Sequence, residues 1–371
     1  MVTSELIQVE KIFGKTVIAG GYALIKTCPI CRGDYTFRFL GTKDLWECKD
    51  CGNSGSWEDL ESTLADKRKM LSAYRGEMQK SVPDGLILLS EWENEVSENR
   101  VMSGFECLDR MIGGFGSGHL TVMTGKRGEG KSTLGSQLAL NAANQGVPVF
   151  FYSGELNVHL FRRWVLNQAA GVEHLVPKTD EAGEQRWFPD YNTESRIIKW
   201  LGENLVLYDN SVAKSSERNA ILERMNKAYI RFGCGIYFID NLMTARYAID
   251  NNQNYYRAQS NFVSELVDFA QQKNVHIVLV AHPRKSIAGE EEDLNDNVAG
   301  SSDVTNRASN VLRVVKLSDK QRESASHDCE LIVTKNREHG RVGKMLFHFD
   351  EASKRFIPSS GKYIGKYSWQ D

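Results

Sequence analysis

The sequence predicts an α/β protein with a mostly parallel sheet covered by helices on both sides, preceded by a small β-rich module. Short apolar runs alternate with stretches of helical period from residue 101 onward, a pattern typical of parallel sheets. A glycine-rich loop follows one of these runs, and two Cys-x-x-Cys pairs lie near the N-terminus. We therefore divide the chain into a cysteine module (1–60), a helical linker (61–100), a large domain (101–358) and a C-terminal tail (359–371).

The composition is that of an ordinary globular protein. The 371 residues carry a formal net charge of −2, so any nucleic-acid contact must come from local basic patches. Seven cysteines, four of them paired, favour metal-binding thiolates in a reducing compartment over a disulfide framework. No apolar run approaches the roughly 20 residues that cross a membrane, and the N-terminal residues lack the apolar core of a signal peptide. We expect a cytoplasmic protein with no membrane partner, in a bacterium or a phage-infected host.

The large domain contains apolar runs rich in β-branched and aromatic residues, which indicate strands buried on both faces. These predicted strands are His119–Thr124, Val147–Ser153, Leu205–Tyr208, Gly235–Ile239, His276–Ala281, Asn310–Lys316 and Glu330–Thr334. Leu134–Gln145 and Tyr256–Gln272 have helical spacing between them. Met345–Phe349 and Arg355–Pro358 flank a polar turn and predict a hairpin that closes the sheet edge.

The strongest motif is the phosphate loop Gly125-Lys-Arg-Gly-Glu-Gly-Lys-Ser-Thr133, which fits Gly-x-x-x-x-Gly-Lys-Ser/Thr between a predicted strand and a predicted helix. Its glycines let the backbone N–H groups turn toward phosphate oxygens, and the helix N-terminus adds its dipole. Lys131 is expected to reach the β- and γ-phosphates of ATP or another NTP, and the Ser132 hydroxyl to ligate Mg²⁺. The predicted nucleotide-binding residues are Gly125, Gly128, Glu129, Gly130, Lys131, Ser132 and Thr133.

Two carboxylates follow predicted strands and can complete this site. Asp240 ends the run that begins at Gly235, which places it beside the phosphate loop, where it can hold Mg²⁺ through water. Glu155 comes just after the run Val147–Ser153. It is either the base that orients the attacking water or a surface glutamate that starts a helix, where acidic residues are favoured.

The N-terminal module has the cysteine spacing of a tetrahedral Zn²⁺ site, with two pairs separated by sixteen residues. A module of about 60 residues with a modest core folds only with its metal. The segment Tyr35-Thr-Phe-Arg-Phe39 alternates aromatic and basic residues, which either stack on single-stranded bases or form the module's core. Core packing is favoured for Phe37 and Phe39, and both readings stay open for Tyr35 and Arg38. The predicted zinc ligands are Cys28, Cys31, Cys48 and Cys51.

The order of motifs from Val101 onward resembles the DnaB-like replicative helicases, above all Twinkle-like and phage primase–helicases. The motifs are the phosphate loop, Ser153-Gly-Glu155, Ile239-Asp-Asn-Leu242, Ala281-His-Pro-Arg-Lys285, Gly300-Ser-Ser-Asp303 and Lys335-Asn-Arg-Glu-His-Gly-Arg-Val-Gly343. The resemblance implies a RecA-like P-loop NTPase core and an ATP-dependent ring, a hexamer or heptamer. It also implies movement on single-stranded or forked DNA in the 5′–3′ direction.

The resemblance also implies roles for the matching residues. Glu155 resembles the catalytic base, and His282 resembles the residue that senses the γ-phosphate. Arg337 resembles an arginine finger inserted into the neighbouring subunit's site, with Lys335 as a second cation, which ties each site to the subunit interface. Two expected channel loops supply weaker DNA-binding candidates, which are Arg246, Arg257, Gly300, Ser301 and Ser302.

The N-terminal module resembles primase-type zinc ribbons, through Cys28-Pro-Ile-Cys-Arg-Gly-Asp34 and Trp46-Glu-Cys-Lys-Asp-Cys-Gly52. In that family the ribbon reads template DNA. About 40 residues separate the module from the large domain, too few for a polymerising domain. Primer synthesis is therefore not expected from this chain, and a separate primase or polymerase is an expected partner.

Two other functions fit parts of the sequence. A RadA-like recombination ATPase also joins a four-cysteine zinc motif to a RecA-like core, and Ser103-Gly-Phe-Glu-Cys-Leu-Asp109 suits it. The His-Pro-Arg-Lys run and the primase-like ribbon favour the helicase. A loader that uses nucleotide only to assemble is the third class, and the presence of Glu155, Asp240 and Arg337 together argues against it.

Overall fold

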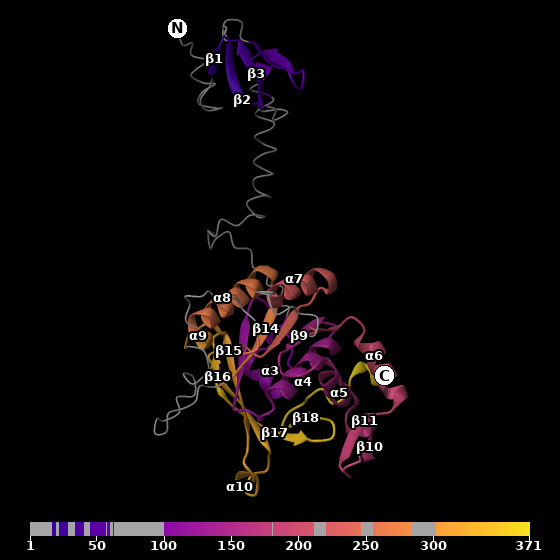
Figure 1. Cartoon of the computed structure of the whole chain (residues 1–371). Coiled ribbons are helices and arrows are strands. Elements are labelled where there is room, and N and C mark those ends of the chain that lie inside the picture. The colour runs from indigo at the N-terminus through magenta and orange to yellow at the C-terminus, as the bar shows by residue number, and fades with distance from the viewer. Residues whose placement is uncertain are drawn as a thin grey trace. The chain divides into compact units, whose positions relative to one another are not determined.

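The computed structural model of the chain divides into two compact units, Met1–Glu95 and Val96–Asp371 (Figure 1). The residues whose structure is described are 17–19, 22–28, 34–40, 45–56, 58–59, 62, 100–179, 181–210, 220–245, 255–282 and 302–371.

The N-terminal unit contains a five-stranded antiparallel sheet in sequence order. Trp46 is 4% exposed, and its indole N–H donates to the carbonyl of Ser56 at 2.9 Å, so this ring belongs to the unit's small core. The side chains of Tyr35, Phe37 and Phe39 lie outside the described residues. The strands are β1 (Val17–Ala19), β2 (Tyr22–Thr27), β3 (Asp34–Leu40), β4 (Leu45–Cys48) and β5 (Ser54–Ser56).

The second unit is built on a nine-stranded sheet in the order β12-β9-β13-β14-β8-β15-β16-β17-β18. Neighbours from β12 to β15 are parallel, and those from β15 to β18 are antiparallel. This confirms the predicted mostly parallel sheet and its closing hairpin. The strands are β8 (Leu120–Thr124), β9 (Val149–Ser153), β12 (Leu205–Leu207), β13 (Ile236–Asp240), β14 (His276–Ala281), β15 (Asn310–Lys316), β16 (Cys329–Asn336), β17 (Gly343–Asp350) and β18 (Arg355–Pro358).

Helices cover both faces of this sheet because its central strands are mostly apolar and buried at every position. On β9 and β13, Phe151 and Phe238 belong to one buried cluster, whereas Phe150 and Tyr237 belong to the other. The first cluster includes residues of α3 (Glu106–Ile112), α4 (Lys131–Asn144), α5 (Val158–Ala170) and α6 (Tyr191–Leu201). The second includes residues of α7 (Ala220–Phe232), α8 (Tyr255–Lys273) and α9 (Ser302–Arg307) (Figure 1).

Several smaller elements were not predicted from the sequence. A two-stranded hairpin follows α5 and packs against it (Figure 1). A short helix also interrupts the connection between β15 and β16. The smaller elements are β6 (Arg100–Val101), β7 (Phe115–Gly116), η2 (Val172–His174), β10 (Leu175–Thr179), β11 (Gln185–Pro189), α10 (Asp319–Arg322) and η3 (Ser368–Gln370).

The residues after β18 pack onto the second unit. Tyr367 and Trp369 are buried, and the Trp369 indole N–H donates to the carbonyl of Ala169 at the end of α5. Arg355, 4% exposed, donates to the carbonyls of Gln168, Ala169 and Gly365, and its guanidinium lies over the Tyr367 ring. A cation at the carbonyl end of α5 also opposes the negative end of the helix dipole. Among the described helices, none is both long and apolar enough to cross a membrane.

Candidate active site and metal centre

The carboxyl ends of four adjacent parallel strands meet at one edge of the sheet. Asp240, the last residue of β13, pairs with Ser153 of β9 on one side and with Val280 of β14 on the other. Thr124, the last residue of β8, pairs with Ala281. This register brings the phosphate loop, Glu155, Asp240 and His282 together, as the sequence predicted.

The phosphate loop has a backbone that glycine allows. Gly130 caps α4 with φ +88°, and a Cβ there would lie 2.8 Å from a Phe356 ring carbon. Gly125 has φ +151°, and a Cβ there would lie 2.5 Å from the Val314 carbonyl oxygen. Lys131 is 5% exposed, and its ammonium donates to the carbonyls of Gly125 and Lys126, each at 2.7 Å. Burial lowers the pKa of Lys131, and the loop's own carbonyls hold its ammonium at the centre of the loop.

Asp240 is the carboxylate that faces the start of α4. It is 1% exposed, and Ser132 hydrogen-bonds to it. Burial, opposed by the Ser132 bond, raises the pKa of Asp240 to about 6, with Glu155 adding a smaller repulsion. Among the described residues, Asp240 Oδ2 has no hydrogen-bond partner. A hydroxyl beside a buried carboxylate with an unused oxygen fits a hard divalent cation such as Mg²⁺.

Asn241 joins Glu155 to His282, a role that sequence analysis missed. Its Nδ2 donates to Glu155 Oε1 at 2.6 Å and lies 3.1 Å from His282 Nε2. Glu155 Oε1 and His282 Nε2 are themselves 3.4 Å apart. Burial lowers the pKa of His282, and the tautomer of the ring decides whether Nε2 donates or accepts in these contacts. The only sequence signal was the position of Asn241 directly after Asp240, within a motif quoted for the family resemblance.

Gly154 allows the Glu155 segment to approach the turn after β13. A Cβ on Gly154 would lie 1.9 Å from Thr244 Oγ1, which any side chain would have to displace. Its backbone N–H donates to the Asp240 carbonyl at 2.6 Å, and the Tyr152 hydroxyl donates to the Thr244 carbonyl at 2.8 Å. The Glu155 segment and the turn after Asp240 therefore form one packed unit.

Arg337 and Lys335 lie beside the amino ends of the parallel strands, away from the carboxyl ends that carry the site. Asn336, between them, pairs with Asn310, which pairs in turn with Thr121 at the beginning of β8. Lys335 Nζ donates to the carbonyls of Thr305 and Asn306, and the exposed Arg337 also donates to Asn306. The phosphate loop follows the carboxyl end of β8, whereas these two cations lie near the amino end of β8. The structure therefore does not bring either cation to the phosphate loop of its own chain.

The predicted DNA contacts fall mostly outside the described residues. Arg246, Gly300 and Ser301 lie outside them, as does the side chain of Ser302, whose backbone begins α9. Arg257 is exposed in the first turns of α8. These five residues therefore stay predictions.

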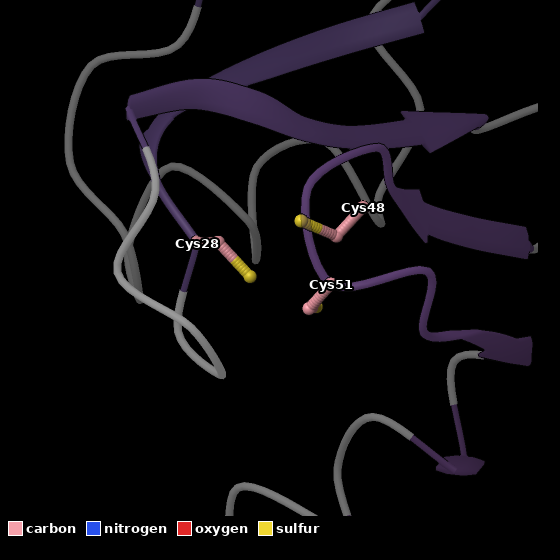
Figure 2. A group of neighbouring side chains, drawn as sticks. All are labelled: Cys28, Cys48 and Cys51. Carbon is pink, nitrogen blue, oxygen red and sulfur yellow. The ribbon is translucent and has the colours of Figure 1, made fainter.

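Three of the four predicted zinc ligands converge in the N-terminal unit (Figure 2). The sulfur atoms of Cys28, Cys48 and Cys51 all lie within 4.8 Å of one another. Cys28 follows β2, whereas Cys48 ends β4 and Cys51 lies in the next turn. Cys28 and Cys48 are buried, at 0% and 2% exposed. Cys31 lies outside the described residues, and a fourth thiolate would complete a tetrahedral set.

Two curated relatives show how far the sequence similarity extends. The replicative DNA helicase DnaB of Mycoplasma genitalium is 27% identical over 281 residues, which cover 72% of this chain and 58% of that protein. The DNA repair protein RadA of Aquifex aeolicus is 30% identical over 118 residues, 30% of this chain and 26% of that protein. The chain thus spans less than two thirds of either relative.

Solved structures show the same fold. One of them, described as an ATPase domain, superimposes with a TM-score of 0.59 at 18% identity and covers 79% of this chain and 98% of that domain. A DnaB-like replicative helicase, described with its interactions with primase, gives a TM-score of 0.57 at 19% identity and covers 69% of this chain and 61% of that one. The family model for the DnaB-like helicase C terminal domain matches residues 100–358. The chain therefore belongs to the family of the DnaB-like helicase C-terminal domain.

Proposed function

We propose that this protein is an ATP-dependent DNA helicase that works as a ring and moves 5′–3′ along single-stranded DNA during replication in the cytoplasm. Family membership and the assembled phosphate loop, Asp240 and Glu155 support nucleotide hydrolysis. The Mycoplasma genitalium relative named replicative DNA helicase matches 72% of this chain, against 30% for the RadA of Aquifex aeolicus. Ring assembly, DNA and direction are proposals for the whole protein.

One observation carries the ring proposal, namely the separation of Arg337 from the phosphate loop of its own chain. The residues that pair across β8, β15 and β16 place Arg337 beyond Thr121, whereas the loop begins after Thr124. Three strand residues span about 10 Å, and the loop carries Lys131 further away. The exposed guanidinium of Arg337, near the amino end of β8, can therefore complete a nucleotide site only in a neighbouring copy.

Each group in the site has a chemical task in this proposal. The loop N–H groups and Lys131 bind the phosphates, and Glu155 orients the attacking water and draws its proton. Ser132 and Asp240 would hold Mg²⁺, which when bound neutralises charge on the phosphate oxygens. The neighbour's Arg337, with Lys335 beside it, stabilises charge on the transferring phosphoryl group.

DNA movement is proposed to follow from two segments that begin at the site. Residues 246–254 follow the turn that starts at Asn241, and residues 283–301 follow His282 directly. Arg246, Arg257, Gly300, Ser301 and Ser302 are the proposed contacts to the strand.

The N-terminal unit is proposed to be a zinc ribbon held by Cys28, Cys31, Cys48 and Cys51. The convergence of three sulfurs on one point supports this assignment. The ribbon would bind template DNA or a partner protein. A separate primase is a proposed partner, since one structural neighbour is described with its interactions with primase.

Three assays test the proposed function. DNA-stimulated ATP hydrolysis is expected, and its absence would favour a loader that uses nucleotide only to assemble. Unwinding of a forked duplex with a 5′ single-stranded tail is expected. Branch migration of a three-stranded junction without fork unwinding would instead favour the RadA-like alternative, which the local similarity to RadA supports.

A further inference from the structure

The side chain of Asn241 is fixed by the turn that it begins. Its Oδ1 accepts from the backbone N–H groups of Met243 at 2.9 Å and Thr244 at 3.2 Å. Because a backbone N–H only donates, the amide oxygen must face the turn. The amide nitrogen therefore faces the opposite way, toward Glu155 and His282.

Each N–H group of this amide has a polar neighbour. One donates to Glu155 Oε1 and the other points to His282 Nε2. Asn241 is 1% exposed, whereas the Glu155 side chain is 46% exposed. Water therefore reaches the carboxylate but not the amide, and an unpaired amide N–H here would be costly. The amide thus fixes the position of the carboxylate relative to the imidazole.

The same turn is held against the Glu155 segment by other contacts. Tyr152 and Gly154 each hydrogen-bond to a carbonyl of the 240–244 segment. The close approach at Gly154 leaves no room for a side chain between the two segments. These contacts therefore hold Asn241 in a fixed position relative to the Glu155 segment.

We propose that Asn241 is a positioning residue that holds the Glu155 carboxylate and the His282 imidazole as one hydrogen-bonded unit for water attack. The inference rests on the proposed hydrolytic function. Without the amide, Glu155 is still present but loses the contact that fixes its carboxylate. The rate of the chemical step then falls, while nucleotide binding, which depends on the phosphate loop, does not.

The substitution Asn241→Asp separates this role from a structural one. Aspartate keeps an oxygen that accepts from Met243 and Thr244, so the turn survives, but the donor to Glu155 is replaced by a repelling oxygen. We expect kcat to fall at least about tenfold while KM changes less than about threefold. The control Asn192→Asp makes the same change at an exposed site on α6 and should leave both constants unchanged. A wild-type kcat in Asn241→Asp would overturn the proposal.

A double-mutant cycle on thermal unfolding tests the contact without any activity. Asn241→Asp sets two carboxylates face to face and should lower the unfolding temperature. Adding Glu155→Gln restores a donor–acceptor pair and should recover at least about half of that loss. If Asn241→Asp lowers the unfolding temperature equally in the wild-type chain and in the Glu155→Gln chain, or if the double variant does not fold, the proposed contact is overturned.

The two proposals can fail separately. If Glu155→Gln hydrolyses ATP normally, the proposed function is wrong whatever Asn241 does. If Glu155→Gln is inactive but Asn241→Asp is fully active, only the positioning role is wrong.

Discussion

Lys131 and Arg337 lie at opposite edges of one sheet. Lys131 follows the loop at the carboxyl end of β8, whereas Arg337 follows β16, whose last residue is aligned through Asn310 with the beginning of β8. One copy of the chain thus holds a phosphate-binding cation and an exposed guanidinium that cannot meet within it. In the proposed ring, each Lys131 site would meet a neighbour's Arg337.

Lys131→Ala should abolish ATP hydrolysis without unfolding the chain. The buried ammonium is the loop's only cation aimed inward among the described residues, through its bonds to Gly125 and Lys126. We expect at least about a hundredfold loss of kcat/KM in a steady-state phosphate-release assay. Lys227→Ala, at an exposed position on α7, is the matched control. Normal turnover in Lys131→Ala would show that hydrolysis occurs elsewhere.

Asp240→Asn should stabilise the magnesium-free protein in a pH-dependent way. Burial raises the pKa of Asp240 to about 6 from 3.8, so the folded chain binds this proton more tightly than the unfolded chain. The charged Asp240 carboxylate therefore destabilises the folded chain. This destabilisation is absent below about pH 4, grows between about pH 4 and pH 6, and stays constant above about pH 6. Two pKa units correspond to about 3 kcal/mol as an upper bound.

Thermal unfolding in chelator between pH 4 and pH 8 measures this effect. The difference between Asp240→Asn and wild type should rise up to about pH 6 and then level off. Asp319→Asn, at an exposed carboxylate of α10, controls for the loss of a negative charge. A difference that stays flat from pH 4 to pH 8 would show that the Asp240 carboxyl is not buried as described.

Metal removal should unfold the N-terminal unit and spare the second unit. Where the burial of this unit's side chains is described, the buried ones are those of Trp46, Cys28 and Cys48, so the cysteines form a large share of that core. Atomic absorption should find about one zinc per chain, and hydrogen exchange after chelation should accelerate over the described residues 17–62 but not over 100–371. Cys48→Ser should reproduce the chelated state, whereas Cys234→Ser, on the second unit, should keep its zinc. Zinc-free protein with an unchanged exchange pattern would contradict the ribbon.

Arg355→Met should lower the free energy of unfolding of the second unit. The guanidinium satisfies carbonyls of Gln168, Ala169 and Gly365 in a buried place, and methionine leaves them unpaired. We expect a loss of about 2–4 kcal/mol by chemical denaturation. Arg231→Met, at an exposed position of α7, should cost much less, and equal losses of unfolding free energy in both variants would rule out this anchoring role.

The sequence predicted the sheet well because its central strands carry runs of mostly apolar, β-branched and aromatic residues. His276–Ala281 and Asn310–Lys316 were placed at their observed bounds, and the closing hairpin was also found. The β10–β11 hairpin was missed because its strands expose most of their residues and one contains Pro177. The residues after Pro358 read as a tail, since nothing local in the sequence reveals that Tyr367 and Trp369 pack onto α4 and α5.

The site was predictable where one short segment carries the chemistry. The phosphate loop and the cysteine pairs are recognisable by their spacing, and strand ends pointed to Asp240 and Glu155. Asn241 could not be assigned, because its contacts with Glu155 and His282 join three strands that are distant in the sequence. The far-edge position of Arg337 likewise depends on the register of β15 and β16.

Mixing two inactive variants tests the shared site most directly. Arg337→Ala subunits keep an intact phosphate loop, and Lys131→Ala subunits keep an intact Arg337, so a mixed ring contains some interfaces with both groups. Each variant alone should be inactive, and the two mixed together should regain part of the DNA-stimulated hydrolysis. Arg231→Ala mixed with Lys131→Ala controls for exchange of subunits. Failure of the two variants to complement, or full activity of a monomer under every ligand condition, would contradict a nucleotide site shared between neighbouring copies.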